Sequence, residues 1–219
     1  MKRIIKKLLG QKTIEYFKFI RLIYFTKDKK EIINARKFFY SSFIKKGEFC
    51  FDVGANIGNR IEPLLQIGAR VLAVEPQKRC YDYLSSKYAN RIILITKGLS
   101  DTEGVKNFYI SSESAISSFS EEWINTVRAG RFKQFDWNRV VETEMTTLDR
   151  LIKEHGVPVF IKIDVEGYEL EVLKGLSTPV KLISFEYTAP EYNGKAIECI
   201  NYMKDLIIIL NVIILFRKV

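Results

Sequence analysis

The sequence has a single histidine, His155, and three cysteines, Cys50, Cys80 and Cys199, with no CxxC pair among them. One histidine without a partner at a suitable spacing argues against a Ser-His-Asp triad and against a multi-histidine metal site. Widely spaced cysteines argue against a disulfide framework or a zinc ribbon. We therefore expect no metal site and a reducing, cytoplasmic compartment.

The chain also lacks a long hydrophobic segment. Its most apolar stretch, residues 206–216, is 11 residues long and contains Asn211, whereas a membrane-spanning helix needs about 20 apolar residues. Residues 1–9 are interrupted by Lys6 and Lys7, so they lack the continuous apolar core of a secretory signal. With 47% hydrophobic and 28% charged residues in a length of 219, the composition is that of a globular protein with one principal core.

Positive charge is concentrated at the N-terminus. Residues 1–47 hold 14 Lys and Arg but 3 Asp and Glu, whereas the rest of the chain holds 21 Lys and Arg and 23 Asp and Glu. A nucleic-acid enzyme normally carries its basic excess in the main domain, so we expect no nucleic-acid partner. Residues 13–25 place apolar side chains at helical spacing with Lys18 and Arg21 at the margin, which predicts a helix that docks on the core or contacts anionic lipid at the inner face of the membrane. We expect a basic helical extension over 1–47 and the main domain over 48–219.

From residue 48 onward, strand and helix patterns alternate. Short apolar runs predict strands at 48–53, 71–74, 92–95, 106–110, 159–163 and 182–185, and helical patterns separate them at 60–67, 80–88, 148–154 and 169–174. This alternation predicts an α/β fold in which a mostly parallel sheet carries helices on both faces. Residues 111–147 follow no clear period, and we expect their Ser-rich part, Ser111 to Ser120 with Trp123, to contact a substrate.

The turn after the first predicted strand reads FDVGANIG, and the next strand ends in Glu75. Gly54 and Gly58 let the backbone bend sharply and approach a ligand, and the following helix presents free N–H groups to a carboxylate. Glu75 is placed to bind the two hydroxyls of a ribose. A dinucleotide fits less well, because Asn56 and Asn59 stand where a pyrophosphate-binding loop has its second and third glycines. The pattern therefore favours S-adenosylmethionine, which has a ribose and an amino-acid carboxylate but no phosphate.

A second group of residues, in the segment FIKIDVEGYE, places two carboxylates after an apolar strand. In a parallel sheet, Asp164 and Glu166 then project into the crevice that holds the ligand. We predict that they orient the acceptor, take its proton or face the cationic sulfonium. Glu169 is more typical of a first-turn acid of the next helix, and Lys162 and Glu186 are weaker candidates at the same edge.

Tyr83 and Lys87 match the YxxxK pair of short-chain dehydrogenases. That chemistry needs the pair at the carboxyl end of a strand, facing the cofactor. Here the pair follows the second strand, on a helix that should cover the sheet, so packing is the favoured role.

Several ordered segments together resemble the FkbM family of S-adenosylmethionine-dependent methyltransferases: FDVGANIG, VLAVEP, MTTLD, FIKIDVEGYELEVLKG and ISFEYT, over about residues 49–188. The resemblance implies a Rossmann-like class I methyltransferase fold for residues 48–219. It also implies O-methylation of a hydroxyl, typically on a sugar or glycan precursor or a secondary metabolite. By this resemblance the cofactor-binding residues are Asp52, Gly54, Asn56, Gly58 and Glu75, and the acidic motif consists of Asp164 and Glu166.

Two features depart from the family pattern. Thr or Ser commonly follows the GANIG loop, where this chain has Asn59-Arg60-Ile61. Two further strands, one of them antiparallel, usually close the sheet, whereas 14 residues follow Asp205. Residues 206–216 suffice for one strand and hardly for a pair, so we expect an incomplete sheet edge, from a truncation or an altered reading frame.

Three rival functions compete with this one, and the sequence argues against the first two. A NAD-dependent sugar oxidoreductase would need glycines for the pyrophosphate, and a nucleic-acid methyltransferase would carry an Asp/Asn-Pro-Pro-aromatic run where IDVEG stands. A cofactor-binding protein with impaired catalysis is compatible with every motif described.

Overall fold

The computed structural model of the chain describes residues 28–205 and 212–216. The predicted helix at 13–25, with its proposed contact with the core or with lipid, lies outside these residues. So does the first part of the apolar tail, residues 206–211.

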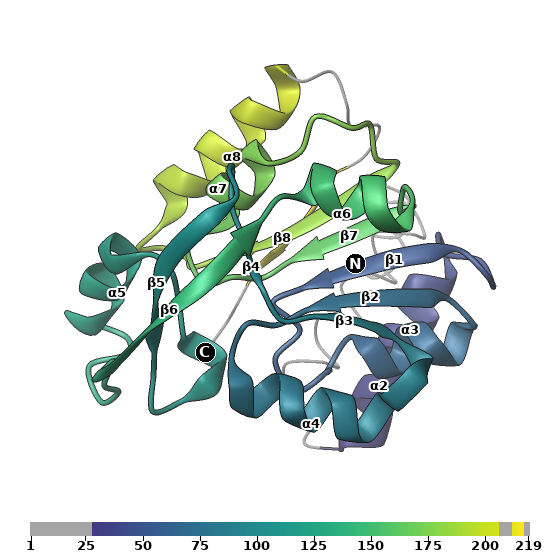
Figure 1. The fold of residues 1–219 in the computed structure, drawn as a ribbon, viewed down its shortest axis with the longest axis horizontal. Helices are drawn as coiled ribbons and strands as arrows, with labels where there is room; N and C mark the ends of the chain where they lie inside the picture. Colours follow the sequence, from purple (N-terminus) through teal and green to yellow (C-terminus); the bar gives the residue numbers. More distant parts are fainter. Residues whose placement is uncertain (1–27, 206–211, 217–219) are drawn as a thin grey trace, which may run out of the picture.

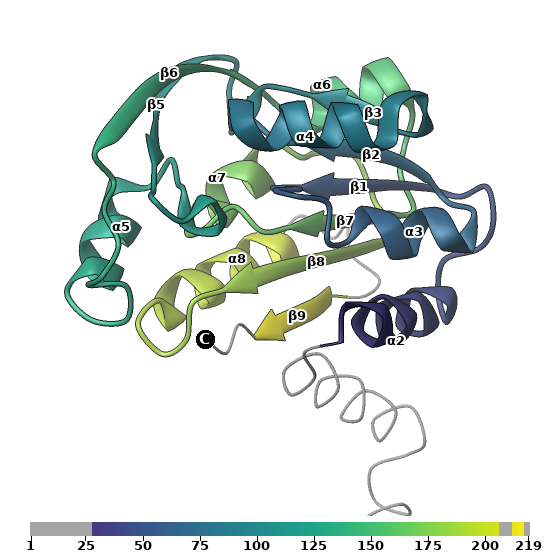
Figure 2. The ribbon, with the colours of Figure 1, turned by 90° about the horizontal axis from the view of Figure 1, so that it is seen from below.

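The central element is a six-stranded sheet in the order β3-β2-β1-β7-β8-β9, in which every neighbouring pair is parallel (Figure 1, with β9 labelled in Figure 2). Its strands are β1 (Phe49–Val53), β2 (Arg70–Val74), β3 (Ile93–Ile95), β7 (Phe160–Ile163), β8 (Leu182–Tyr187) and β9 (Val212–Phe216). The chain passes from β1 outward to β3 and returns on the other side of β1 as β7, so the strand order reverses between β1 and β7. Ligands of open α/β sheets bind at such a reversal, outside the carboxyl ends of the strands.

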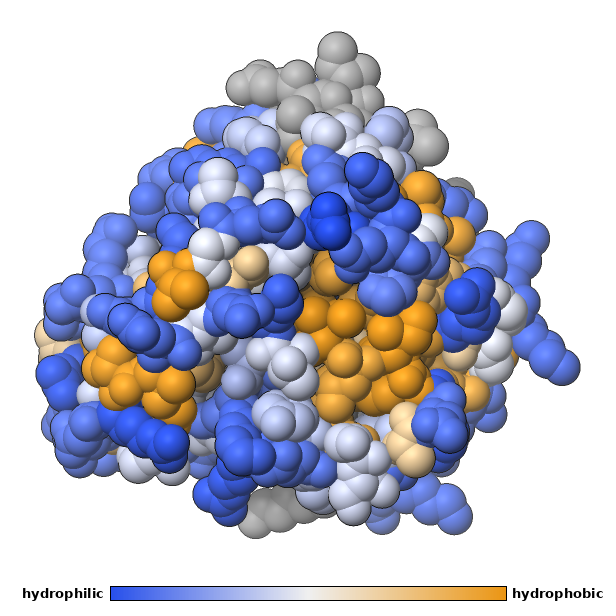
Figure 3. Space-filling view, viewed as in Figure 1, coloured by the Kyte–Doolittle hydropathy of each residue, from blue (hydrophilic) through white to orange (hydrophobic). Residues whose placement is uncertain are grey.

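Helices cover both faces of this sheet, as predicted (Figure 2). One face carries α2 (Lys29–Ser41), α3 (Ile61–Ile67) and α4 (Lys78–Tyr88). The other carries α6 (Leu148–His155), α7 (Glu169–Lys174) and α8 (Asn193–Asp205). A hydrophobic area remains at the surface of this second face beside α6 (Figure 3).

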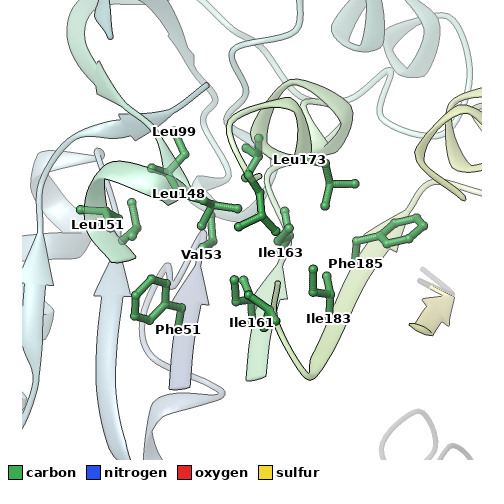
Figure 4. Packing of buried hydrophobic residues seen from close by; sticks show 14 of the residues in the cluster. Phe51, Val53, Leu99, Leu148, Leu151, Ile161, Ile163, Leu173, Ile183 and Phe185 are labelled. Carbon is green, nitrogen blue, oxygen red and sulfur yellow. The ribbon is translucent and has the colours of Figure 1, made fainter. Parts of the chain in front are cut away.

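The larger core lies between the sheet and α6, α7 and α8. Alternate residues of β1, β7 and β8 point toward these helices because successive side chains of a strand face opposite sides. Figure 4 shows this layer of Phe51, Val53, Leu99, Leu148, Leu151, Ile161, Ile163, Leu173, Ile183 and Phe185. Burying each large side chain contributes about 1.5–3 kcal/mol, so the ends of these strands are firmly positioned.

The helix α2 packs against the opposite face. Tyr40 and Ile44 are almost fully buried there with Leu182, and the rings of Tyr40 and Phe160 lie 5.7 Å apart between centroids. Arg36, one turn earlier in α2, donates a hydrogen bond from its guanidinium to the carbonyl of Asn59 at 3.0 Å. Residues before position 48 therefore contribute to the core and reach the loop that follows β1.

A second, three-stranded sheet holds β4 (Gly98–Leu99), β6 (Arg139–Thr146) and β5 (Gly104–Ile110), in that order. Between β5 and β6 the chain forms the short 3-10 helix η2 (Ser114–Ile116) and α5 (Glu121–Arg128), which pack around Trp123 and Trp137. The sequence patterns did not predict β6, because just three of its eight side chains are buried and no apolar alternation marks it.

The apolar tail supplies one strand at Val212–Phe216, as expected, and that strand pairs with β8 in parallel. Among the described residues, the large sheet has no antiparallel strand.

Candidate functional site

A cavity of about 460 Å³ opens at the carboxyl ends of β1, β2, β7 and β8. The rest of its wall comes from α2, from β4 and β5, and from η2 and its neighbours in the segment between β5 and β6. The volume falls within the range of about 300–1,000 Å³ that is usual for small-molecule and cofactor sites.

Gly54 begins the loop after β1 and lies in contact with the carboxyl ends of β2 and β7. Its φ is +70°, and a Cβ atom at this position would lie 1.9 Å from the carbonyl oxygen of Asp164. The amides of Gly54 and Ala55 both donate to the carbonyl of Val74, at 3.0 and 3.1 Å. The loop after β1 is thus packed against the ends of both β2 and β7, which leaves no room for a side chain.

Glu75 holds this loop from the end of β2. One carboxylate oxygen accepts the amide of Asn56 at 2.7 Å and the other accepts the amide of Gln77 at 2.9 Å. Burial raises the pKa of Glu75 to about 7, although these two hydrogen bonds lower it. A carboxylate has about four acceptor positions, so each oxygen can accept one further hydrogen bond from a ligand hydroxyl.

The acidic turn, residues 164–167, follows β7 and is held from below by Glu169. One oxygen of the Glu169 carboxylate accepts the amides of Val165 and Gly167 at 3.1 and 3.2 Å. Burial raises the pKa of Glu169 to about 7. Glu169 was predicted to act as a first-turn acid of the next helix; it is the first residue of α7, and it accepts from the turn itself.

The segment between β5 and β6 holds the acidic turn from the other side. Ser118 donates a hydrogen bond to the carbonyl of Glu166 at 2.7 Å. Glu166 and Gly167 both have positive φ, at 56° and 86°, and a Cβ atom on Gly167 would lie 2.3 Å from Trp123. Trp123 in turn donates from its ring nitrogen to Thr188 at 2.9 Å. The conformation of the turn therefore depends on residues far away in the sequence.

Lys162 links the two halves of the site beneath the cavity. Its ammonium donates to the carbonyls of Val53 and Gly54 at 3.1 and 2.9 Å. It also lies 3.1 Å from Asp52 and 3.5 Å from Asp164. Burial lowers the pKa of Lys162, but the two carboxylates outweigh that effect and the pKa is raised. Lys162 is therefore a buried cation that ties the loop after β1 to β7.

Most of the predicted site residues line this one cavity, namely Gly54, Asn56, Glu75, Asp164 and Glu166. Asp52 and Gly58 lie behind its wall. Asp52 is fully buried against Lys162, and Gly58, with φ +82°, faces Tyr88, where a Cβ atom would come within 2.8 Å of the ring.

Other predictions have mixed outcomes. Ser114 and Ser117 of the Ser-rich segment line the cavity. The expected substrate contact of Trp123 is wrong, because this side chain is fully buried in the small core beside the cavity. Tyr83 and Lys87 lie on α4, outside the cavity lining, with the ammonium 5.4 Å from the ring centroid.

Two arginines that the sequence patterns did not single out as site residues also line the cavity. Arg36 comes from α2, and Arg60 directly precedes α3. Arg36 lies four residues before Tyr40, which places a cation on the buried stripe of an amphipathic helix. A cation at such a position is the sequence feature that could have identified Arg36 as a site residue.

Within residues 28–205 and 212–216, no group of three His, Cys, Asp or Glu side chains could hold a metal ion. In the same part of the chain, no helix combines the length and hydrophobicity required to cross a bilayer.

Sheet order, cavity position and loop chemistry define a doubly wound α/β protein with a small-molecule site where its strand order reverses. The family model described as the methyltransferase FkbM domain matches residues 52–211. The chain belongs to this methyltransferase family, whose activity requires a methyl donor.

Comparison with characterised proteins and solved structures adds two similarities. A hexuronic acid methyltransferase, AglP, from Haloferax volcanii is 28% identical over 144 residues, which cover 64% of this chain and 55% of that protein. The chain therefore matches little more than half the length of this relative. The crystal structure of the CurK enoyl reductase matches 85% of this chain and 41% of that chain, with 10% identity and a TM-score of 0.39. This likeness is too distant to support a conclusion.

Proposed function

We propose that the protein transfers a methyl group from S-adenosylmethionine to a hydroxyl of a sugar or glycan precursor. The observation that carries this proposal is the cavity in which Glu75 and the acidic turn meet, in a chain that belongs to the FkbM family. The similarity to a protein named as a hexuronic acid methyltransferase supports a sugar acceptor. The three described cysteines are buried and free, which supports a cytoplasmic setting.

The residues present fit S-adenosylmethionine better than a dinucleotide. Glu75 has an unused acceptor position on each oxygen for the ribose hydroxyls. Asn56 lines the cavity where a pyrophosphate-binding loop has a glycine, and its side-chain amide donates to Ser114 at 3.4 Å, so the backbone there carries a side chain that the close approach of a pyrophosphate disfavours. Leu99, Phe108 and Phe119 form an apolar part of the lining that suits a flat base, with the two phenyl centroids 4.5 Å apart.

In the proposed reaction, the sulfonium supplies an electrophilic methyl group and leaves as a neutral thioether. The acceptor oxygen forms the new C–O bond as the C–S bond breaks, and the hydroxyl proton passes to a carboxylate. Asp164 is the first choice for this acceptor-orienting or proton-accepting group, since its side chain is 22% exposed and lines the cavity. Glu166 is the second choice.

Positioning would supply most of the rate. Holding two reactants in line can contribute about 7–11 kcal/mol, whereas a positioned base adds roughly 10²- to 10⁴-fold. The Lys162 ammonium lies 3.5 Å from Asp164 and holds that carboxylate at the cavity wall, where it can accept a hydrogen bond from the acceptor hydroxyl.

Calorimetry and a transfer assay test this proposal. The purified chain should bind S-adenosylmethionine and S-adenosylhomocysteine but not NAD, and labelled methyl should pass to a sugar or glycan in a panel. Tighter binding of NAD would contradict the cofactor assignment. Binding of the methyl donor without transfer to any member of a broad glycan panel would instead indicate a cofactor-binding protein without catalysis.

Two variants with a matched control test the residue roles. Glu75→Ala should weaken donor binding at least tenfold, and Asp164→Ala should lower turnover by about 10²-fold or more with donor binding largely retained. Glu154→Ala, which removes a carboxylate on the exposed side of α6, should behave like the parent. If both site variants bound and turned over like the control, the assignment of these residues would be wrong.

A further inference from the structure

Two positively charged side chains stand in the cavity wall without a carboxylate partner. Arg36 uses one guanidinium nitrogen to reach the Asn59 carbonyl, while its buried Nε has no hydrogen-bond partner. Among the residues that the structure describes, no carboxylate lies within 4.0 Å of the guanidinium of Arg36 or Arg60. Such an arrangement is typical of a site that receives its negative charge from a ligand.

The electrostatics of the pair support this interpretation. Burial and, to a smaller extent, the positive charge of Arg60 together lower the pKa of Arg36 to about 10. Tyr40, Glu186 and Asp52 oppose that effect from a longer range. Burial also lowers the pKa of Arg60, but Tyr40, Glu186, Asp164 and Asp52 outweigh that effect and the pKa is raised. The deficit of negative charge is therefore at Arg36, and an anion bound between these two half-buried cations would relieve their repulsion.

The position of the pair points to the acceptor and not to the methyl donor. Tyr40 packs on Phe160 at the amino end of β7, and Arg36 lies one helical turn, about 5.4 Å, nearer the carboxyl ends. The carboxylate of Glu186, which acts on both arginines, belongs to β8. In the sheet order, β8 lies three strands from β2 and Glu75, roughly 14 Å away at about 4.8 Å per strand. A donor with its ribose at Glu75 and its methyl near the acidic turn would place its carboxylate at the N–H groups that begin α3, next to Arg60. Those N–H groups can bind the donor carboxylate without the guanidinium groups, which leaves the arginine pair to the acceptor.

We propose that Arg36 and Arg60 bind an anionic group of the acceptor, a carboxylate or a phosphate carried by the sugar, and thereby select acidic over neutral sugars. This inference rests on the proposed function for the identity of the acceptor as a sugar. Arginine suits the role because its planar fork binds carboxylate and phosphate oxygens through two parallel hydrogen bonds.

Calorimetry with defined probes tests the site without requiring turnover. In the presence of saturating S-adenosylhomocysteine, methyl glucuronide or glucose 1-phosphate should bind at least tenfold more tightly than methyl glucoside. The tighter of the two acidic probes identifies the anion as a carboxylate or a phosphate. Equal affinity for acidic and neutral probes would overturn the inference.

Variants then assign the preference to the two arginines. Arg36→Gln and Arg60→Gln should each reduce the preference for the acidic probe at least fivefold, and Arg60→Lys should retain part of it because the charge remains. Arg139→Gln is the matched control, since it removes the same charge from an exposed position on β6. A thermal unfolding curve for each variant identifies any that fails to fold, in which case Arg36→Lys replaces Arg36→Gln.

Two outcomes separate this inference from the proposed function. If the arginine variants lost affinity for S-adenosylhomocysteine and kept the preference for acidic probes, the pair would bind the donor carboxylate and the inference would fail. If the acidic probe bound in an arginine-dependent manner but no methyl were transferred, the anion site would stand and the proposed catalysis would fail.

Discussion

Binding of the methyl donor should depend on pH through Glu75. Burial raises the pKa of this carboxyl to about 7, and both of its oxygens already accept backbone amides. Ribose hydroxyls donate best to the ionised form, which accepts at every position. Because the ionised fraction decreases as the pH falls through about 7, affinity for the donor should decrease over the same interval.

The magnitude follows from the ionised fraction. With a pKa of about 7, roughly nine tenths of the protein is ionised at Glu75 at pH 8 and roughly one tenth at pH 6. An apparent dissociation constant increases in inverse proportion to the competent fraction, so it should be about tenfold higher at pH 6 than at pH 8. At pH 7, binding should release about half a proton, because the ligand favours the ionised form.

Calorimetry with S-adenosylhomocysteine between pH 6 and 8, in buffers of different ionisation heat, measures both quantities. Glu75→Gln should bind more weakly and without this pH dependence. Glu169→Gln is the necessary second control, because the pKa of Glu169 is also raised to about 7. A pH dependence that survived in Glu75→Gln and vanished in Glu169→Gln would refute the assignment, as would a dissociation constant that did not change with pH in the parent.

Three substitutions and one control test the construction of the site. Gly54→Ala should lower the free energy of unfolding by more than about 2 kcal/mol, because the backbone is left-handed and the new Cβ would meet the acidic turn at 1.9 Å. Gly194→Ala, in α8 with open space around it, should be neutral or stabilising by up to about 1 kcal/mol in the same urea titration. Glu169→Gln should have a higher free energy of unfolding than the parent, by an amount that grows from nothing below pH 4.5 to about 3 kcal/mol above pH 7. The reason is that a carboxyl with a raised pKa in the folded state loses stability as it ionises. A difference between variant and parent that is the same at pH 5 and pH 8 would contradict this. Ser118→Ala should cost about 1 kcal/mol and lower kcat with S-adenosylhomocysteine affinity within twofold of the parent, and unchanged kcat would show that its hydrogen bond does not position the turn.

The parts of the fold that the sequence predicted are those that local patterns determine. The strand before Gly54, the strand before Glu75 and the strand before Asp164 are short apolar runs that end in turn residues, and each formed where expected. Because parallel strands bring their carboxyl ends to one edge, five of the predicted site residues that line the cavity could be grouped from the sequence alone.

The parts that escaped prediction depend on contacts between distant segments. Arg36 reaches the cavity because α2 packs on β7, and nothing in the helix itself specifies that partner. Trp123 is a core residue because the segment between β5 and β6 folds around it, so its burial could not be derived from the Ser-rich sequence nearby. Asp52 has the sequence position of a cofactor residue, but its carboxylate is paired with the ammonium of Lys162. Lys162 lies opposite Asp52 on the neighbouring strand β7.

The packing of α2 matters for anyone who wishes to excise a minimal folding unit. A shortened chain that began at Glu48 would retain every recognisable methyltransferase segment and still expose the underside of Phe160 to water, because the rings of Tyr40 and Phe43 now cover it. It would also lose the guanidinium of Arg36. Expression of such a fragment should therefore yield aggregated material. A fragment that starts before Asp28 keeps both the aromatic rings that cover Phe160 and the positive charge of Arg36.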